Sequence, residues 1–269
     1  MSPSPPPPLK RFGQHFLIDQ NIVRKIVALA AIQPHETVLE IGPGRGILTR
    51  AICAQARKVI AIEIDRQLAQ ILTDFCPNLD LRVGDALEFE YGGLPEGTVV
   101  VANLPYYVST AVLFKLLESS HKIDRLVLMM QAEVAQRLAA KPDTKEYGVL
   151  SVLTQYRAAV TVAFRVSAHC FRPRPTVGSA VVHLQVKSAR LLDAAHEARF
   201  IRLVRAAFAH RRKILVNSLR DEGYAADSVT AALSRCGIAG GRRAESLSLD
   251  DYLALAAALD DEPRPESLG

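Results

Sequence analysis

Short apolar runs alternate with stretches of helical spacing along the chain from residue 37 onward. Runs of this kind, bounded by polar or glycine-containing turns, are typical of strands in a buried parallel sheet, and the helical stretches between them complete βα units. The pattern therefore predicts an α/β fold built on a mainly parallel sheet. The strands that we expect are 37–41, 59–64, 79–83, 99–102 and 126–130.

Helices and two further strands are expected around these five strands. Residues 21–31 place their apolar side chains on one stripe of a helix. Ser109 is expected to cap a helix that runs to about residue 118, and residues 133–139 are expected to form the helix after the fifth strand. The apolar stretches 158–166 and 179–186 predict an antiparallel addition, which makes a seven-stranded sheet.

The strand pattern ends near residue 187, where Ala- and Leu-rich stretches with helical spacing take over. The chain begins Met-Ser-Pro-Ser-Pro-Pro-Pro-Pro, which lacks the apolar region of a signal peptide and favours a stiff, peripheral arm. We therefore expect a flexible Pro-rich arm at 1–9, the α/β domain at 10–187 and a small C-terminal helical domain at 188–269. Its helices are expected near 194–208, 213–219, 227–236 and 250–259.

Composition narrows the class of protein. With 269 residues, 49% of them hydrophobic, the chain is long enough for one large core and a small second domain, and it is too apolar to be disordered. The longest uncharged run, 97–114, is too short and too polar to cross a bilayer, so no membrane segment is expected. The cysteines lack the paired spacings of a metal site, and we expect no metal and reduced thiols in the cytoplasm. They are Cys53, Cys76, Cys170 and Cys236.

The net charge of +5 conceals two opposed segments. Residues 187–220 carry nine basic and two acidic side chains, whereas residues 221–269 carry four basic and ten acidic ones. Their net charges, +7 and −6, nearly cancel. A basic segment in the helical domain suits a nucleic-acid partner, and a solvated basic face is the alternative.

A glycine-rich turn, Glu-Ile-Gly-Pro-Gly-Arg-Gly at 40–46, follows the first expected strand and opens a helix at about residue 47. Glycines at such a turn allow a sharp bend and let the backbone approach a ligand closely. A plain turn between strand and helix, or a nicotinamide or flavin site, would also place glycines here. The spacing is Gly-x-Gly-x-Gly, however, whereas the dinucleotide fingerprint is Gly-x-Gly-x-x-Gly.

Two carboxylates near the ends of the next two strands extend the candidate site. Glu63 lies near the end of the second strand, where it can accept hydrogen bonds from both hydroxyls of a ribose. Asp85 follows the third strand, where it can accept a hydrogen bond from an adenine amine. Asp65 and Asp85 could instead cap helices. Together with the glycine turn, these residues favour a nucleoside cofactor without a pyrophosphate.

The segment Asn103-Leu104-Pro105-Tyr106 follows the fourth strand and resembles the catalytic loop of class I (Rossmann-like) methyltransferases that use S-adenosyl-L-methionine and act on the N6 atom of adenine. An aromatic amine is a poor nucleophile because its lone pair is delocalised into the ring. The Asn103 side-chain carbonyl and the Leu104 backbone carbonyl can accept its two N–H bonds and favour a tetrahedral nitrogen. Pro105 fixes the turn, and Tyr106 offers a face on which the target adenine can stack. We assign no general base, since the nitrogen can lose its proton to water.

The resemblance extends from residue 10 to about residue 259 and points to the small-subunit ribosomal RNA adenine dimethyltransferases (the KsgA or RsmA family). It rests on the segments RFGQHFL (11–17), QAEVAQR (131–137), YGVLSV (147–152), FRPRPTVGSAVV (171–182) and FAHRRKILVNSL (208–219). His15 stands where many members have Asn, so its contact is expected to use backbone atoms. Thr176 and Gly178 depart from the expected Lys and Asp. The resemblance implies cofactor contacts at His15, Leu17, Gly42, Glu63, Asp85 and Asn103.

The resemblance implies transfer of four methyl groups, two to each of two adjacent adenines in a hairpin near the 3′ end of 16S ribosomal RNA. The reaction is expected late in small-subunit assembly, so the implied partner is 16S ribosomal RNA within immature small subunits, and a monomer is expected. Basic side chains would grip phosphates. The candidates are Lys10 and Arg11, Arg172 and Arg174 of a rigid proline loop at 171–175, and Arg211, Arg212 and Lys213.

Two other functions remain open. A 23S ribosomal RNA adenine N6-methyltransferase of the macrolide-resistance type has similar loop and cofactor motifs, although the segments 171–182 and 208–219 favour the small-subunit enzyme. The third hypothesis is an RNA-binding ribosome assembly factor whose catalysis is dispensable. The presence of Glu63, Asp85 and Asn103 favours retained catalysis.

Overall fold

The structure, a computed structural model, describes residues 13–187 and 192–260. The expected arm at 1–9 and the candidate residues Lys10 and Arg11 lie outside the described residues. The described chain forms two compact units. Residues 13–136 and 158–187 make the first, called here the sheet unit, and residues 137–157 and 192–260 make the second, the helical unit.

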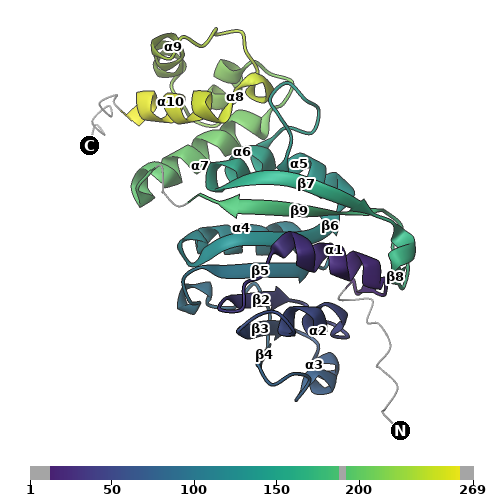
Figure 1. The fold of residues 1–269 in the computed structure, drawn as a ribbon. Coiled ribbons are helices and arrows are strands. Elements are labelled where there is room, and N and C mark those ends of the chain that lie inside the picture. The colour runs from purple at the N-terminus through teal and green to yellow at the C-terminus, as the bar shows by residue number, and fades with distance from the viewer. Residues whose placement is uncertain (1–12, 188–191, 261–269) are drawn as a thin grey trace. The chain divides into compact units, whose positions relative to one another are not determined.

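The sheet unit is built on seven strands in the order β4-β3-β2-β5-β6-β9-β7 (Figure 1). The strands from β4 to β6 run parallel to their neighbours, whereas β9 pairs antiparallel with both β6 and β7. The predicted α/β class and mainly parallel sheet are thus confirmed. The strands are β2 (Thr37–Ile41), β3 (Lys58–Glu63), β4 (Leu79–Val83), β5 (Thr98–Asn103), β6 (Ile123–Gln131), β7 (Ala158–Val166) and β9 (Ser179–Val186).

Helices α1 (Gln20–Ala30) and α2 (Ile47–Cys53) share one core with the sheet. The predicted stripe on α1 is buried, and Asp19 caps this helix by accepting hydrogen bonds from the backbone N–H groups of Asn21 and Ile22. Valines at alternate strand positions meet these helices because successive strand side chains point to opposite faces. Val38, Val59, Val99, Val101 and Val127 belong to this core.

The helix α4 (Ser109–Glu118) has the predicted bounds but not the predicted cap. Val108 occupies the N-cap position and makes no side-chain capping bond, while Ser109 is the first helical residue. The Ser109 hydroxyl donates backward to the carbonyl of Tyr106 at 3.1 Å. The Ser109 hydroxyl therefore stabilises the loop before the helix and does not cap the helix as we expected. The helix α3 (Arg66–Leu72) and the first five residues of α5 (Ala132–Leu138) complete the sheet unit, together with short 3-10 helices at Tyr91–Gly93, Ser120–Lys122 and Ala168–Cys170.

A second, two-stranded sheet joins β1 (Phe16–Leu17) to β8 (Phe171–Arg172) in antiparallel pairing. The sequence predicted a rigid loop at 171–175, and its first two residues are instead strand. Two-residue strands are too short to show an alternating pattern, so periodicity could not reveal them. The pairing fastens the segment around His15 to the basic proline loop.

The helical unit contains α6 (Val149–Arg157), α7 (Ala194–Ala209), α8 (Leu215–Asp221), α9 (Ala226–Arg235) and α10 (Leu249–Asp260), with a 3-10 helix at Ala244–Ser246. The predicted α/β domain at 10–187 is wrong for residues 137–157. The Tyr156 and Phe200 rings lie 4.8 Å apart, and Arg157 forms an ion pair with the buried Glu197 of α7. These contacts join α6 to the helices that follow the sheet in sequence, which a linear division of the chain could not anticipate.

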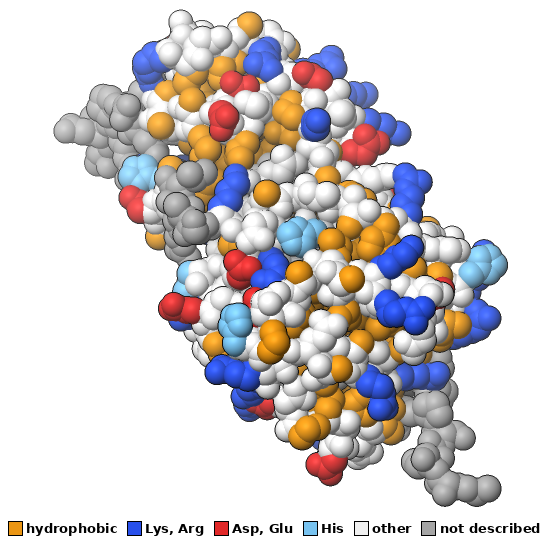
Figure 2. Space-filling view, viewed as in Figure 1, with side chains coloured by type: hydrophobic (Ala, Val, Ile, Leu, Met, Phe, Trp, Pro, Cys, Tyr) orange, Lys and Arg blue, Asp and Glu red, His pale blue; other side chains and the backbone are white. Residues whose placement is uncertain are grey.

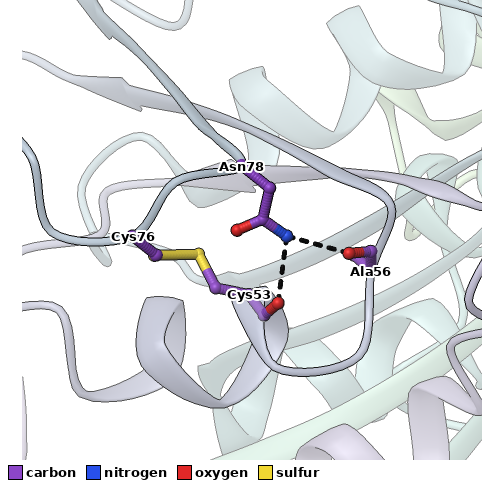
Figure 3. The surroundings of a disulfide bond; sticks show 4 residues. All are labelled: Cys53, Ala56, Cys76 and Asn78. Atoms are coloured by element: carbon purple, nitrogen blue, oxygen red, sulfur yellow. Dashed lines mark hydrogen bonds between the residues drawn. A yellow bond between two sulfur atoms is a disulfide. The ribbon is translucent and has the colours of Figure 1, made fainter.

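A disulfide joins Cys53 to Cys76, so the predicted reduced thiols are wrong for this pair (Figure 3). Cys53 ends α2 and Cys76 lies in the loop before β4, with their Cα atoms 6.6 Å apart. The Asn78 amide donates to the carbonyls of Cys53 and Ala56 and fixes the same corner. Parallel strands return the chain to one edge of the sheet, so cysteines 23 residues apart in sequence meet there. Cys170 and Cys236 are free thiols.

Among the described helices, none has the length and apolar character needed to cross a membrane.

Candidate active site

The predicted catalytic and cofactor-binding residues, with one exception, line a single cavity at the carboxyl ends of the parallel strands, where open α/β sheets bind ligands. Leu17 is the exception, because it lines a small neighbouring pocket with Gly42 and Asn103. Residues that sequence reasoning did not single out also line the cavity, among them Gln14, Phe16, Ile62, Ile64 and Tyr107. The predicted residues in its wall are His15, Gly42, Glu63, Asp85, Asn103, Leu104, Pro105 and Tyr106.

The glycine turn bends because three glycines adopt positive φ angles: 68° at Gly42, 59° at Gly44 and 78° at Gly46. Steric crowding also excludes a side chain at Gly46. A Cβ on Gly46 would lie 2.7 Å from Leu72 and from Phe75. Glycine therefore serves both the turn conformation and the close packing beside α3, and it leaves the cavity side of the turn lined by backbone.

Glu63 is 4% exposed, and both of its carboxylate oxygens are held by backbone N–H groups. Oε2 accepts from Gly44 at 3.0 Å, and Oε1 accepts from Asp65 at 2.9 Å. Burial raises the pKa of Glu63, and the nearby Asp65 charge adds to the effect. Each oxygen keeps a further lone pair. The side chain is thus a fixed acceptor in the cavity wall, linked directly to the glycine turn.

Asp85 sits in a turn that three side chains hold. Its Oδ1 accepts from the Leu87 N–H at 2.8 Å, the Tyr91 hydroxyl donates to the Ala86 carbonyl at 2.8 Å, and Lys115 donates to the Leu87 carbonyl. Residues 86–88 form a turn and the next helix begins only at Tyr91, so the helix-cap alternative is wrong for Asp85. Asp85 lines the cavity, and one of its carboxylate oxygens is used in the local turn.

The loop after β5 is tied to two other segments. The Leu104 N–H donates to the Met129 carbonyl of β6 at 3.0 Å, and the Asn103 side-chain Nδ2 donates to the His15 carbonyl at 3.2 Å. A backbone carbonyl can only accept, so this bond defines which end of the Asn103 amide is nitrogen. The amide oxygen is left on the opposite side of the side chain as the acceptor.

Tyr106 is held beside the His15 ring. The two ring centroids lie 5.6 Å apart with a tilt of 32°, and the His15 ring donates from Nδ1 to the Pro173 carbonyl at 2.8 Å. The Tyr106 hydroxyl oxygen lies 2.6 Å from the Ser179 hydroxyl oxygen. Burial raises the pKa of Tyr106, so its hydroxyl stays protonated at neutral pH.

The segment 13–15 closes one side of the cavity, and sequence reasoning had singled out only His15. Gln14 donates from Nε2 to Asp65 Oδ2 at 3.0 Å. Gly13 has φ +54°, and a Cβ built on it would lie 3.4 Å from the Tyr107 ring; Tyr107 is 57% exposed and lines the cavity. The sequence did offer one signal for Tyr107, because it is a second tyrosine directly after Tyr106.

The predicted phosphate-gripping residues fall on two surfaces. Arg172 and Arg174 are exposed in the sheet unit. In the helical unit, Arg211 donates to the carbonyls of Lys145 and Tyr147, and Lys213 pairs with Asp221, which leaves Arg212 exposed with no partner among the described residues. Figure 2 shows Lys and Arg side chains scattered over the visible face of the sheet unit and mixed with Asp and Glu on that of the helical unit.

A seven-stranded sheet with a glycine turn, two strand-end carboxylates and an Asn-x-Pro-Tyr loop around one cavity defines a class I methyltransferase fold. The family model described as ribosomal RNA adenine dimethylase matches residues 9–261. The chain belongs to this family.

Individual relatives and solved structures agree with the family match. Ribosomal RNA small subunit methyltransferase A of Moorella thermoacetica is 42% identical over 94% of this chain and 92% of its own length. That of Bacillus mycoides is 41% identical over 93% and 90%. Among structures, a dimethyladenosine transferase from Plasmodium falciparum has a TM-score of 0.80 and 27% identity, covering 90% of this chain and 96% of its own. The 23S rRNA methyltransferase ErmE has a TM-score of 0.71 and 30% identity, covering 91% and 99%.

Proposed function

We propose that this chain transfers methyl groups from S-adenosyl-L-methionine to the N6 atoms of two adjacent adenines in a 3′-terminal hairpin of 16S ribosomal RNA. The observation that carries the proposal is the fixed Asn103 amide, whose nitrogen is taken by the His15 carbonyl and whose oxygen remains as an acceptor in the cavity wall. The proposed substrate is the RNA of immature small subunits, and the proposed state is a cytoplasmic monomer.

The residues of the cavity fit such a cofactor. The glycine turn presents backbone without side chains, which allows close approach of an amino-acid or ribose group. Glu63 can accept from the ribose hydroxyls, and Asp85 from the adenine amine. Contacts of His15 and Leu17 would come from the β1 segment. When bound, S-adenosyl-L-methionine supplies an electrophilic methyl group on a positively charged sulfur.

The loop supplies the substrate side of the reaction. In the first transfer, the Asn103 side-chain oxygen and the Leu104 carbonyl accept hydrogen bonds from the two N–H groups of the target amine, which orients its lone pair and favours a tetrahedral nitrogen. In the second transfer the monomethylated amine has one N–H left to donate. Pro105 keeps the turn rigid, and Tyr106 stacks on the adenine after the base has left its own stack. The nitrogen gives up its proton to solvent, so no side chain of the cavity is required as a base.

Two alternatives differ in substrate or in class. The 23S methyltransferase ErmE shares the fold, but it is 30% identical, whereas the small-subunit methyltransferases reach 42%. That difference favours the small subunit. A role as an assembly factor without catalysis would not require Glu63, Asp85 and Asn103 to meet at one cavity, and this convergence favours an active enzyme.

The test is incubation of the full chain with methyl-labelled S-adenosyl-L-methionine and small subunits from a strain that lacks this methylation, followed by mapping of the modified bases. We expect two adjacent dimethylated adenines near the 3′ end of 16S ribosomal RNA. Label in 23S ribosomal RNA, offered as large subunits in a parallel reaction, would support the macrolide-resistance type instead. Binding to small subunits without incorporation would support the assembly-factor role.

A further inference from the structure

The Tyr106 side chain is anchored at its far end by a serine on the antiparallel side of the sheet. The hydroxyl oxygens of Tyr106 and Ser179 lie 2.6 Å apart, although the residues are 73 positions apart in sequence. Ser179 is 1% exposed and is the first residue of β9. It pairs with Gln131 of β6 on one side and with Val166 of β7 on the other. The strand pairing on both sides makes Ser179 a rigid anchor.

The backbone contacts of Tyr106 do not by themselves fix its ring. The Ser109 hydroxyl holds the Tyr106 carbonyl at 3.1 Å, which positions the backbone of the loop. Rotation about the two side-chain torsions would still move the ring, because the second torsion of an aromatic side chain has a broad preference. A hydrogen bond at the phenolic oxygen restrains both torsions. His15 lies 5.6 Å from the ring centroid and limits movement toward one side.

We propose that Ser179 is a positioning residue for methyl transfer, whose hydroxyl holds the Tyr106 ring at the angle on which the target adenine stacks. The inference rests on the proposed function. The second transfer is the more demanding step, because the amine already carries one methyl group and must present its lone pair within the same space. Loss of the Ser179 hydroxyl should therefore impair the second methylation more than the first.

The test compares wild type, Ser179→Ala, Tyr106→Phe and the double variant with small-subunit substrate. We expect Ser179→Ala to lower kcat about five- to tenfold, the effect of one hydrogen bond. The share of monomethyl-adenine in digested RNA should rise, while the Kd for S-adenosyl-L-methionine stays within about twofold. Tyr106→Phe removes the same hydrogen bond from its other end and should give the same result. The double variant should be no worse than either single variant.

Thr98→Val is the matched control. Thr98 is fully buried at the opposite end of β5, where its hydroxyl donates to the Pro95 carbonyl, and it lies outside the cavity wall. This variant should lose stability without changing the product ratio. A wild-type product ratio and kcat in Ser179→Ala would overturn the inference, as would losses that multiply in the double variant. If Ser179→Ala does not fold, Tyr106→Phe decides alone. If the wild type methylates no adenine, the proposed function fails and this inference falls with it.

Discussion

At the scale of single residues, the site depends on side chains that are held in place by hydrogen bonds to backbone groups and still have an acceptor free for a ligand. Asn103 is the clearest case, since the His15 carbonyl takes its amide nitrogen and thereby leaves its oxygen for a ligand. Glu63 is held in the same manner by Gly44 and Asp65. A pre-oriented acceptor needs no reorganisation during the reaction, which is the condition under which such groups lower an activation barrier most.

Replacing Asn103 tests this account directly. Asn103→Ala removes the acceptor without adding bulk, and we expect kcat to fall by at least about 100-fold, the usual cost of removing one oriented group. Binding to small subunits should remain within about twofold, because the basic residues proposed to contact phosphates lie elsewhere. The measurement is label incorporation beside a filter-binding titration with the same preparation. A variant with wild-type turnover would refute the assigned role.

Glu40 provides a prediction for stability rather than catalysis. It is 1% exposed on β2, its Oε2 has no hydrogen-bond partner within the described residues, and burial raises the pKa of its carboxyl group to about 8, with the Glu63 charge contributing. The folded chain therefore keeps a proton that the unfolded chain releases above its ordinary value of 4.5. The stabilisation that this proton gives to the folded state is fully present below pH 4.5, and it is lost as the pH rises toward 8.

The isosteric variant Glu40→Gln should lack this dependence. Between about pH 5 and pH 8, the free energy of unfolding of the wild type should fall relative to that of the variant by about 1 kcal/mol per pH unit. Urea titrations of both proteins at matched pH values measure the difference. Parallel pH profiles for the two proteins would show that Glu40 is ionised in the folded state.

At the scale of elements, loops far apart in sequence are fastened together around the cavity. β1 pairs with β8, and the disulfide joins the end of α2 to the loop before β4. α2 begins at the glycine turn, and Phe75 of the bridged loop would collide with any side chain on Gly46. The disulfide is therefore expected to stabilise the support behind the turn.

Closing a loop of 23 residues should contribute about 3 kcal/mol to the free energy of unfolding. Addition of a thiol reductant should lower the urea midpoint of the wild type to that of Cys53→Ser, and it should leave Cys53→Ser itself unchanged. Cys236→Ser, which removes a free thiol, should respond to reductant as the wild type does. Equal midpoints with and without reductant would contradict the prediction.

At the scale of the whole molecule, the charge of the helical unit is less available than its sequence indicates. The segment 187–220 has a net charge of +7, yet the Lys213 ammonium faces Asp221 and the Arg211 guanidinium binds backbone carbonyls. Of the three adjacent basic residues, Arg212 is the one without a partner in the described chain. Its charge is the one that can meet a phosphate without breaking an existing contact.

Neutralising Arg211, Arg212 and Lys213 together is expected to weaken binding to immature small subunits and to flatten the dependence of this binding on salt. Arg212→Gln alone should already lower the slope of log affinity against log salt by about 1. The control variant, Arg57→Gln, removes one exposed charge from the sheet unit and should leave the slope of log affinity against log salt unchanged. Titrations at four salt concentrations give the slopes. An unchanged slope in the triple variant would remove these residues from the RNA-binding surface.

The sequence by itself determined the α/β class, the five parallel strands to within a few residues, the antiparallel addition and the candidate residues Glu63, Asp85 and Asn103. These follow from local hydrophobic periodicity and from residues next to strand ends, both of which can be recognised within a short window, whereas the candidates His15 and Leu17 rest on the family resemblance. The tertiary structure alone decided that α6 joins the helical unit, that Cys53 meets Cys76, and that Arg211 and Lys213 are engaged. It also decided that Ser179 reaches Tyr106. Apart from the Lys213–Asp221 pair, these contacts join segments that lie far apart in the sequence, so no local pattern records them.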